Sequence, residues 1–334
     1  MTESETRFQG RIRSGEPLLV VEIAPPKGGD PAPLRAAAKR YAGRVHAIGV
    51  SDNRNGVCMS ALAAAAIVAA EGVEPILHLA TRDRNRIALI ASCLGAQALG
   101  VRNILCTSGT HQTLGICPPA KNVFDIDSTQ LIEAIAHLGE IGDSYLFSPD
   151  NRDGSGQTHN GRKIGNSPLF PDGAGPFCLG AVAAPFADPA ELQLMRLSKK
   201  VAAGAQFLIT QPVYDLDRFG AWWDQVTQRG IHEKASILAG IHPLLDADQA
   251  KAYAASRPFP MVPQALLDKL SSAGDRKAQR AAGIEIAIET VKQVSALNGV
   301  RGLCISFPSS TWERGEGDEN AALEIIERSG LEAR

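Results

Sequence analysis

The chain has 334 residues, of which 44% are hydrophobic and 21% are charged. These are ordinary fractions for a globular protein, and they exclude disordered, collagen-like and coiled-coil chains. The 34 basic residues are balanced by 36 acidic ones, so the composition lacks the basic excess of a dedicated nucleic-acid binder.

From the sequence we expect neither a membrane-spanning segment nor an export signal. The longest apolar run, Ala61 to Ala70, falls far short of the roughly 20 residues that cross a bilayer. Met1 to Glu16 is polar and lacks the apolar stretch of a signal peptide. The six cysteines are widely spaced and form no Cys-x-x-Cys pair, so we expect reduced, mostly buried thiols. Together these features predict a cytoplasmic protein without a membrane partner.

Short runs rich in Val, Ile and Leu alternate along the chain with segments of helical spacing. Buried strands separated by helices predict a parallel sheet, and eight strand–helix units predict a (βα)8 TIM-type barrel. A doubly wound open sheet is the alternative, although no Gly-x-Gly-x-x-Gly motif follows a strand. The predicted strands are Leu18 to Ile23, Val45 to Ser51, Glu74 to Ala80, Asn103 to Thr107, Cys178 to Ala183, Gln206 to Gln211, Ser236 to Ile241 and Gly302 to Phe307. The predicted helices are Pro33 to Tyr41, Ser60 to Ala70, Arg84 to Ala98, Ser128 to His137, Pro189 to Ala203, Asp215 to Gln228, helical material from Asp246 to Leu297, and Asn320 to Arg328.

One segment interrupts the alternation. Gly142 to Pro176 is rich in Asp, Asn, Gly, Ser and Pro, and a loop of this length is usually functional or disordered. It falls between the fourth helix and the fifth strand, which places it at the amino-terminal face of a barrel. We therefore expect one catalytic domain over residues 1–334, with a loop insertion at about 142–176. We favour a surface excursion or subunit contact for this loop, and a part of the active site is the alternative.

The carboxyl end of the first strand carries a glutamate within an apolar run. Catalytic groups of (βα)8 barrels lie at the carboxyl ends of the strands. Burial raises a carboxyl pKa, which would suit Glu22 to act as a general acid. The alternative is a structural carboxylate paired with a buried arginine or lysine.

Other polar groups lie at or beside further strand ends. His78 in an apolar strand is more often a hydrogen-bonded core residue than a ligand. Ser108 and Gly109 offer a hydroxyl and a close backbone approach, and the Gln211 amide suits the edge of a heterocycle. Lys200 lies on a helix and either faces solvent or meets a phosphate. No histidine–carboxylate cluster has metal-ligand spacing, so we expect no metal site.

Several stretches together resemble the 5,10-methylenetetrahydrofolate reductase family, from about residue 8 to residue 310. The resemblance implies a (βα)8 barrel that converts 5,10-methylenetetrahydrofolate to 5-methyltetrahydrofolate, or catalyses the reverse. It also implies FAD as the hydride carrier, NAD(P)H as the hydride source and a place in one-carbon metabolism. The matching stretches are Val21 to Lys27, Leu77 to Leu79, Thr81 to Asp83, Asn103 to Leu105, Ala203 to Gln211 and Ala239 to Ile241, and Lys121 to Ser128 resembles one branch of the family.

The resemblance also implies roles for single residues. Glu22 matches the general acid that protonates N10 of the folate and opens the imidazolidine ring to an N5 iminium. Gln211 and Thr110 match positions at the pterin, and Lys200 matches a position near the FAD diphosphate. The remaining cofactor-binding positions are Ser51, His78, Ser108, Gly109 and Phe124.

Three positions depart from the family pattern. Thr110 and Gln193 stand where the family has aspartates, and Ala184 lies near a position that holds a tyrosine. These departures leave two alternatives open, which are direct hydride transfer from NADH without flavin and a folate-binding subunit without catalysis. A homo-oligomer and an electron-transfer partner subunit are further expectations from the resemblance.

Overall fold

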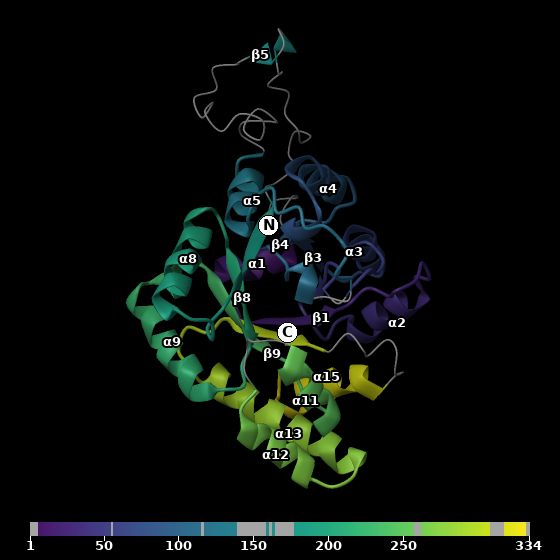
Figure 1. Cartoon of the computed structure of the whole chain (residues 1–334), viewed down its shortest axis with the longest axis vertical. Coiled ribbons are helices and arrows are strands. Elements are labelled where there is room, and N and C mark those ends of the chain that lie inside the picture. The colour runs from purple at the N-terminus through teal and green to yellow at the C-terminus, as the bar shows by residue number, and fades with distance from the viewer. Residues whose placement is uncertain are drawn as a thin grey trace.

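The computed structural model describes residues 6–54, 56–114, 117–138, 158–159, 162–163, 177–256, 262–307 and 317–331. Its centre is a closed barrel of parallel strands in the order β1-β10-β9-β8-β7-β4-β3-β2, surrounded by helices (Figure 1). The predicted (βα)8 barrel is therefore confirmed. The barrel strands are β1 (Leu18–Ile23), β2 (Ala47–Val50), β3 (Pro75–Ala80), β4 (Asn103–Thr107), β7 (Cys178–Ala183), β8 (Phe207–Pro212), β9 (Ser236–Ile241) and β10 (Gly302–Ser306).

The helices cover the outside of the barrel, with α3 and α4 opposite α12 and α13 (Figure 1). The helical material predicted from Asp246 to Leu297 forms three separate helices, and a short helix after α9 was not predicted. The covering helices are α2 (Ala32–Tyr41), α3 (Ala61–Ala70), α4 (Arg86–Ala98), α5 (Ser128–Ala136), α8 (Ala190–Ala202), α9 (Leu216–Gln228), α10 (Ile231–Lys234), α11 (Ala247–Ser256), α12 (Gln264–Ser272), α13 (Arg276–Ser295) and α15 (Gly317–Arg328).

Many of these helices begin at a side chain that caps them. Ser60, Asn85, Asp127, Asp215 and Asp275 each accept a hydrogen bond from a backbone N–H in the first turn that follows. Such caps satisfy donors that the helix itself leaves unpaired, and each contributes about 1 kcal/mol. The polar residue that ends a strand–helix connection therefore also fixes where the helix starts.

Side-chain alternation along the strands separates two apolar layers. On β1, Leu19 and Val21 pack outward in the large core between the strands and the helices. Leu18 and Val20 belong to a second cluster inside the barrel. Glu22 continues the inward alternation of Leu18 and Val20, so it faces the interior at the carboxyl end of the barrel.

A helix that the sequence did not predict closes the other end of the barrel. In α1 (Arg7–Ser14), Phe8 is fully buried and meets the Phe207 ring edge-to-face at 5.3 Å between centroids. The Glu74 carboxylate accepts hydrogen bonds from the backbone N–H groups of Arg7 and Phe8, at 2.6 and 3.0 Å. Thr6 caps the helix. The amino-terminal segment is thus part of the barrel core.

Most of the predicted insertion at 142–176 lies outside the described residues, and so does its expected role. Within it, β5 (Thr158–His159) and β6 (Arg162–Lys163) pair antiparallel, where the sequence predicted only loop. None of the six cysteines forms a disulfide and four are buried, as expected. No helix in the described ranges combines the length and apolar character that a membrane span needs.

Replacing Phe8 tests whether α1 belongs to the core. We expect Phe8→Ala to lower the free energy of unfolding by about 3–5 kcal/mol, because it leaves a cavity against Phe207. Gly10→Ala on the same helix is the control, since a Cβ at Gly10 meets nothing within 4 Å and alanine favours helix. Equal denaturant midpoints for Phe8→Ala and the parent protein would contradict the assignment.

Candidate active site

Glu22 lies at the mouth of the barrel, between Gly49 on β2 and Ser306 on β10 in the strand register. Its side chain is 13% exposed, and Arg54 Nη1 donates a hydrogen bond to its Oε1 at 2.5 Å. Arg54 belongs to the loop between β2 and α3. The sequence left open that Glu22 is a structural carboxylate paired with an arginine or lysine. Such an arginine is present, and it is Arg54 in the loop after β2.

Gly49 allows Glu22 and His78 to come close together. A Cβ at position 49 would lie 3.0 Å from His78 Nε2 and 3.6 Å from Glu22 Cα. His78 Nε2 is buried and makes no hydrogen bond within the described residues. The sequence favoured a core histidine whose ring is hydrogen-bonded, and this nitrogen differs from that expectation. Burial lowers the pKa of His78, while the charge of Glu22 opposes this shift. The imidazole at the mouth is therefore neutral near pH 7, with one nitrogen available to a ligand.

A local irregularity of β8 presents Gln211. The β8–β9 register shifts between Ile209 and Pro212. Thr210 Oγ1 accepts from the Gly240 N–H and donates to the Gln211 carbonyl, both at 2.8 Å. Gln211 Oε1 is buried and has no hydrogen-bond partner in the described part of the chain. A buried amide oxygen of this kind carries a desolvation cost that a ligand N–H would relieve.

Ser51 and Asp52 follow β2 directly and are both buried. The Asp52 carboxylate is held by Arg84 at 2.5 and 3.1 Å and by the Ala80 N–H at 2.9 Å. Its side chain is 1% exposed, so this ion pair lies inside the protein. Asp52 is therefore occupied in joining the loops after β2 and β3.

Arg82 joins three loops at the mouth. Its guanidinium donates to the Asp83 carboxylate at 2.8 and 2.6 Å, to the Asn53 carbonyl at 3.1 Å and to the Thr110 carbonyl at 3.2 Å. Asn53 has a φ of 47°, a strained value for a residue other than glycine. The sequence indicated Arg82 only as part of the stretch Thr81 to Asp83 that resembles the family. The alternating arginines at 82, 84 and 86 are the signal that could have predicted a network of arginine–carboxylate contacts here.

A second group of expected residues lies around β4. Ser108 Oγ accepts from the Ser128 N–H at 3.3 Å, and Gly109 has a φ of +80°. Thr110 is exposed, and its carbonyl is the acceptor for Arg82. Phe124 is exposed and stacks on His111 at 6.2 Å between ring centroids.

Lys200 on α8 reaches a barrel strand instead of open solvent. Its Nζ donates to the Val182 carbonyl at 2.7 Å, near the carboxyl end of β7. Burial lowers the pKa of Lys200, and the charge of Asp127 works in the opposite direction. Of the two positions that depart from the family pattern nearby, Ala184 follows β7 and Gln193 lies on α8, and both are half-buried.

The expected residues thus form two groups. An inner group at the mouth consists of Glu22, Ser51, His78 and Gln211. Arg54, which the sequence did not indicate, belongs to the same group because it binds Glu22. An outer group around β4, α5 and α8 consists of Ser108, Gly109, Thr110, Phe124 and Lys200. Within the described residues, no three His, Cys, Asp or Glu side chains gather as a metal-binding cluster.

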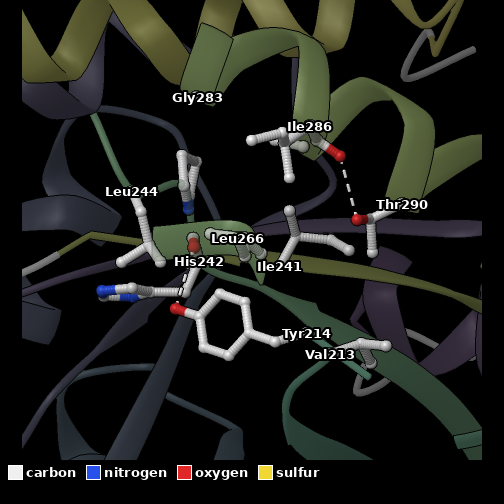
Figure 2. A pocket seen from close by; sticks show the side chains of 11 residues that line it. Val213, Tyr214, Ile241, His242, Leu244, Leu266, Gly283, Ile286 and Thr290 are labelled. Carbon is white, nitrogen blue, oxygen red and sulfur yellow. Dashed lines mark hydrogen bonds between the residues drawn. The ribbon is translucent and has the colours of Figure 1, made fainter. Parts of the chain in front are cut away.

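Beside the mouth, the loops after β8 and β9 contact each other through Tyr214 and His242, which line a pocket (Figure 2). The Tyr214 hydroxyl donates to the His242 carbonyl at 3.0 Å, and the His242 ring contacts Ser306 Oγ at 3.0 Å and stacks on Tyr253 at 4.6 Å. This pocket has a volume of about 20 Å³, enough for one water molecule. A larger cavity of about 440 Å³ lies at the opposite end, beside α1 and α10, and contains none of the expected residues. The mouth is therefore a candidate site because of the chemistry of its side chains, and not because of cavity size.

Two carboxylates, one paired with Arg84 just before α4 and one with Arg86 at its first position, allow a matched test. We expect Asp52→Asn to lower the free energy of unfolding by about 3–5 kcal/mol, since it leaves Arg84 partly buried without its counter-ion. Asp125→Asn should cost less than about 1 kcal/mol, because the Asp125–Arg86 pair is 30% and 37% exposed. Chemical denaturation measures both values, and equal losses would show that Asp52 does not hold the loops.

Comparison with known proteins places the chain among its relatives. A family model described as methylenetetrahydrofolate reductase matches residues 7–144 and 172–307. Methylenetetrahydrofolate reductase 1 from Schizosaccharomyces pombe is 31% identical over 160 residues, which are 46% of this chain and 24% of that protein. The match thus spans about a quarter of that relative's length.

Solved structures share the fold at low identity. An uncharacterized protein from Clostridium thermocellum that binds two copies of 5-methyl-5,6,7,8-tetrahydrofolic acid has a TM-score of 0.59 at 12% identity, with 96% and 98% of the two chains covered. DmoA from Hyphomicrobium sulfonivorans has a TM-score of 0.52 at 11% identity, with 95% and 89% covered. Because the family model extends over most of the sequence, the chain belongs to the methylenetetrahydrofolate reductase family.

Proposed function

We propose that this protein reduces 5,10-methylenetetrahydrofolate to 5-methyltetrahydrofolate by hydride transfer, or runs the reverse oxidation. The observation that carries the proposal is the set of polar groups at the carboxyl ends of three barrel strands. Glu22 continues the interior positions Leu18 and Val20, His78 continues Ile76, and Gln211 lies in the irregular end of β8. A carboxyl group, a neutral imidazole and an unpaired amide oxygen therefore lie at one mouth.

Glu22 is the proton donor in this proposal. Protonation of N10 makes it a leaving group, the bond between N10 and the bridging methylene breaks, and the N5 iminium forms. Hydride addition to the exocyclic methylene then yields the methyl group. The carboxyl group must be protonated to do this, so the Arg54 contact has to change during the reaction.

Gln211 positions the pterin. Its buried Oε1 accepts a hydrogen bond from a pterin N–H, and its side-chain NH2 is available to an acceptor on the same edge. A site that leaves a buried acceptor unpaired discriminates against molecules that cannot fill it. Gln211 is therefore expected to act on binding more than on the proton-transfer step.

FAD fits the residues that the structure provides. The unpaired Nε2 of His78 lies at the mouth with Ser51, where the flavin ring would bind. Ser108, Gly109 and Phe124 continue outward toward the Lys200 cation, which would serve the diphosphate. FAD, when bound, supplies the hydride after reduction by NAD(P)H.

Direct hydride transfer from NADH is the second candidate. Two observations favour it over a flavin. Lys200 already donates to the Val182 carbonyl, and the exposed Thr110 offers no charge near the mouth. In this case NADH would occupy the place assigned to the flavin.

The visible absorption spectrum distinguishes the two hydride sources. We expect flavin bands to remain with the protein after FAD is added and the excess is removed, together with NAD(P)H oxidation that depends on methylenetetrahydrofolate. A colourless protein that oxidises NADH with this folate would support direct transfer. A protein inactive with either nicotinamide nucleotide, with and without FAD, would contradict the proposed reaction.

Replacing the acid tests the chemical step. We expect Glu22→Gln to lower kcat by about 100- to 10,000-fold, because the amide cannot donate the proton, while folate binding persists. Glu16→Gln is the control, since Glu16 is 52% exposed and pairs with Arg11 of α1 at the opposite end of the barrel. Turnover of Glu22→Gln at the parent rate would refute the assigned role.

A further inference from the structure

We propose that the cavity beside α1 and α10 binds a small hydroxylated anion, which is a carboxylate or a phosphate ester that also carries hydroxyl groups. This cavity lies at the opposite end of the barrel from the mouth, so the proposal is independent of the reaction proposed there. Its volume of about 440 Å³ lies within the usual range of small-molecule sites. It is lined by the second half of α1, by α10 and by residues at the starts of β8, β9 and β10.

The charged side chains that line this cavity are mostly basic. Arg13, Lys234 and Arg301 stand against one acidic residue, Glu233. The Glu233 carboxylate turns back toward the start of α10, since a Cβ at Gly230 would lie 3.6 Å from its Oε2. Cations from three separate elements therefore surround one cavity, in a chain whose formal net charge is -2. Such a local excess of positive charge attracts anions.

Two of these cations have donors to offer to a ligand. Arg301 Nη1 donates to the Gly15 carbonyl at 2.8 Å, which holds the guanidinium beside the end of α1. The other N–H groups of Arg301 have no partner among the residues that the structure describes. Lys234 is exposed, and its ammonium group makes no hydrogen bond or ion pair with any described residue. A guanidinium presents its donors in a fixed fork that matches carboxylate and phosphate, and an ammonium on a flexible stem adapts to either.

Two neutral polar residues of the same cavity each have a buried atom that the fold does not satisfy. Gln206 Oε1 and His232 Nδ1 make no hydrogen bond within the described part of the chain. Gln206 is fixed at the start of β8, because its backbone N–H donates to the Leu179 carbonyl at 2.7 Å and its carbonyl accepts from the Ser236 N–H at 2.9 Å. The unpaired amide oxygen therefore belongs to a residue that the barrel holds in place.

The His232 ring is also held in place. It packs edge-on against Trp223 at 6.2 Å between centroids, and a Cβ at Gly299 would lie 2.9 Å from its Cδ2. A buried polar atom without a partner carries a desolvation cost that a ligand can relieve. Hydroxyl groups suit both positions, because a hydroxyl can donate to the amide oxygen of Gln206 and can donate to or accept from an imidazole nitrogen. The ligand that fits therefore combines an oxyanion with hydroxyl groups.

Titration calorimetry on the full chain tests whether such an anion binds. Ribose 5-phosphate and citrate are the probes, because they represent the phosphate ester and the carboxylate, and ribose and glycerol are the uncharged controls. We expect at least one of the two anions to bind and neither uncharged compound to do so. Binding of ribose 5-phosphate alone would assign the site to phosphate esters, and binding of citrate alone would assign it to carboxylates. Binding of neither anion, or equal binding of the uncharged compounds, would overturn the inference.

Substitutions show whether the anion binds in this cavity. We expect Arg301→Met and Lys234→Gln each to weaken binding of the anion by about 10-fold or more, because each removes a charged hydrogen bond to it. Arg276→Met and Lys277→Gln are the matched controls, since both residues are exposed at the far end of the 20-residue helix α13, whose last residue lies shortly before Gly299. An affinity that is unchanged in Arg301→Met and Lys234→Gln would place the anion elsewhere on the protein and overturn the inference.

Gln206→Leu tests the neutral half of the site. Leucine is close to glutamine in size and lacks the amide, so it removes the unpaired oxygen from the cavity. We expect the melting temperature without added anion to stay the same or rise, and the affinity for the anion to fall by about 5-fold or more. Anion binding with the parent's affinity would overturn the assignment of hydroxyl groups to the ligand. A variant that melts well below the parent would show that the amide serves the fold, and would overturn that assignment too.

Discussion

The site depends on the closure of the barrel between its first and last strands. β1 and β10 pair in parallel from Leu18 opposite Gly302 to Glu22 opposite Ser306. A Cβ at Gly302 would lie 2.0 Å from the Leu18 carbonyl oxygen, so only glycine permits this approach. Closure places β1 inside a continuous sheet instead of at an edge. Glu22 consequently has a strand on each side, with Arg54 arriving from one neighbour and Ser306 from the other.

Two arginine–carboxylate pairs at this mouth differ in what they do. The Asp52 carboxylate is almost fully buried, binds Arg84 through both oxygens and also accepts from a backbone N–H, so its charge is satisfied by a fixed structure. The Glu22 carboxylate has a partly exposed arginine that holds it through one hydrogen bond. Removing a partner from a buried pair is strongly destabilising, because the remaining charge is left uncompensated. The Asp52–Arg84 pair therefore maintains the loops, and the Glu22–Arg54 pair has the fewer hydrogen bonds of the two.

The strands were predictable because buried parallel strands are continuous apolar runs, and their observed ends fall within two residues of the predicted ones. The helix α1 was missed because Phe8 and Ile12 are apolar residues in an otherwise polar segment. Glu22 stood out as an acid in an apolar strand. Its arginine did not, because Arg54 lies in a loop whose path depends on Arg82 and on the positive φ of Asn53. Local periodicity contains no information about such long-range contacts.

The mouth carries polar groups that folding alone does not require. His78 Nε2 and Gln211 Oε1 are buried without partners among the described residues, and each costs stability in the empty protein. Such costs are typical of sites prepared for a ligand. A bare buried carboxylate would cost far more, and Arg54 offsets that cost while the site is empty. An adjacent guanidinium favours the ionised carboxylate, whereas the proton donation that we propose for Glu22 needs the neutral form. The contact that stabilises the folded barrel therefore opposes the proposed chemistry at the same side chain.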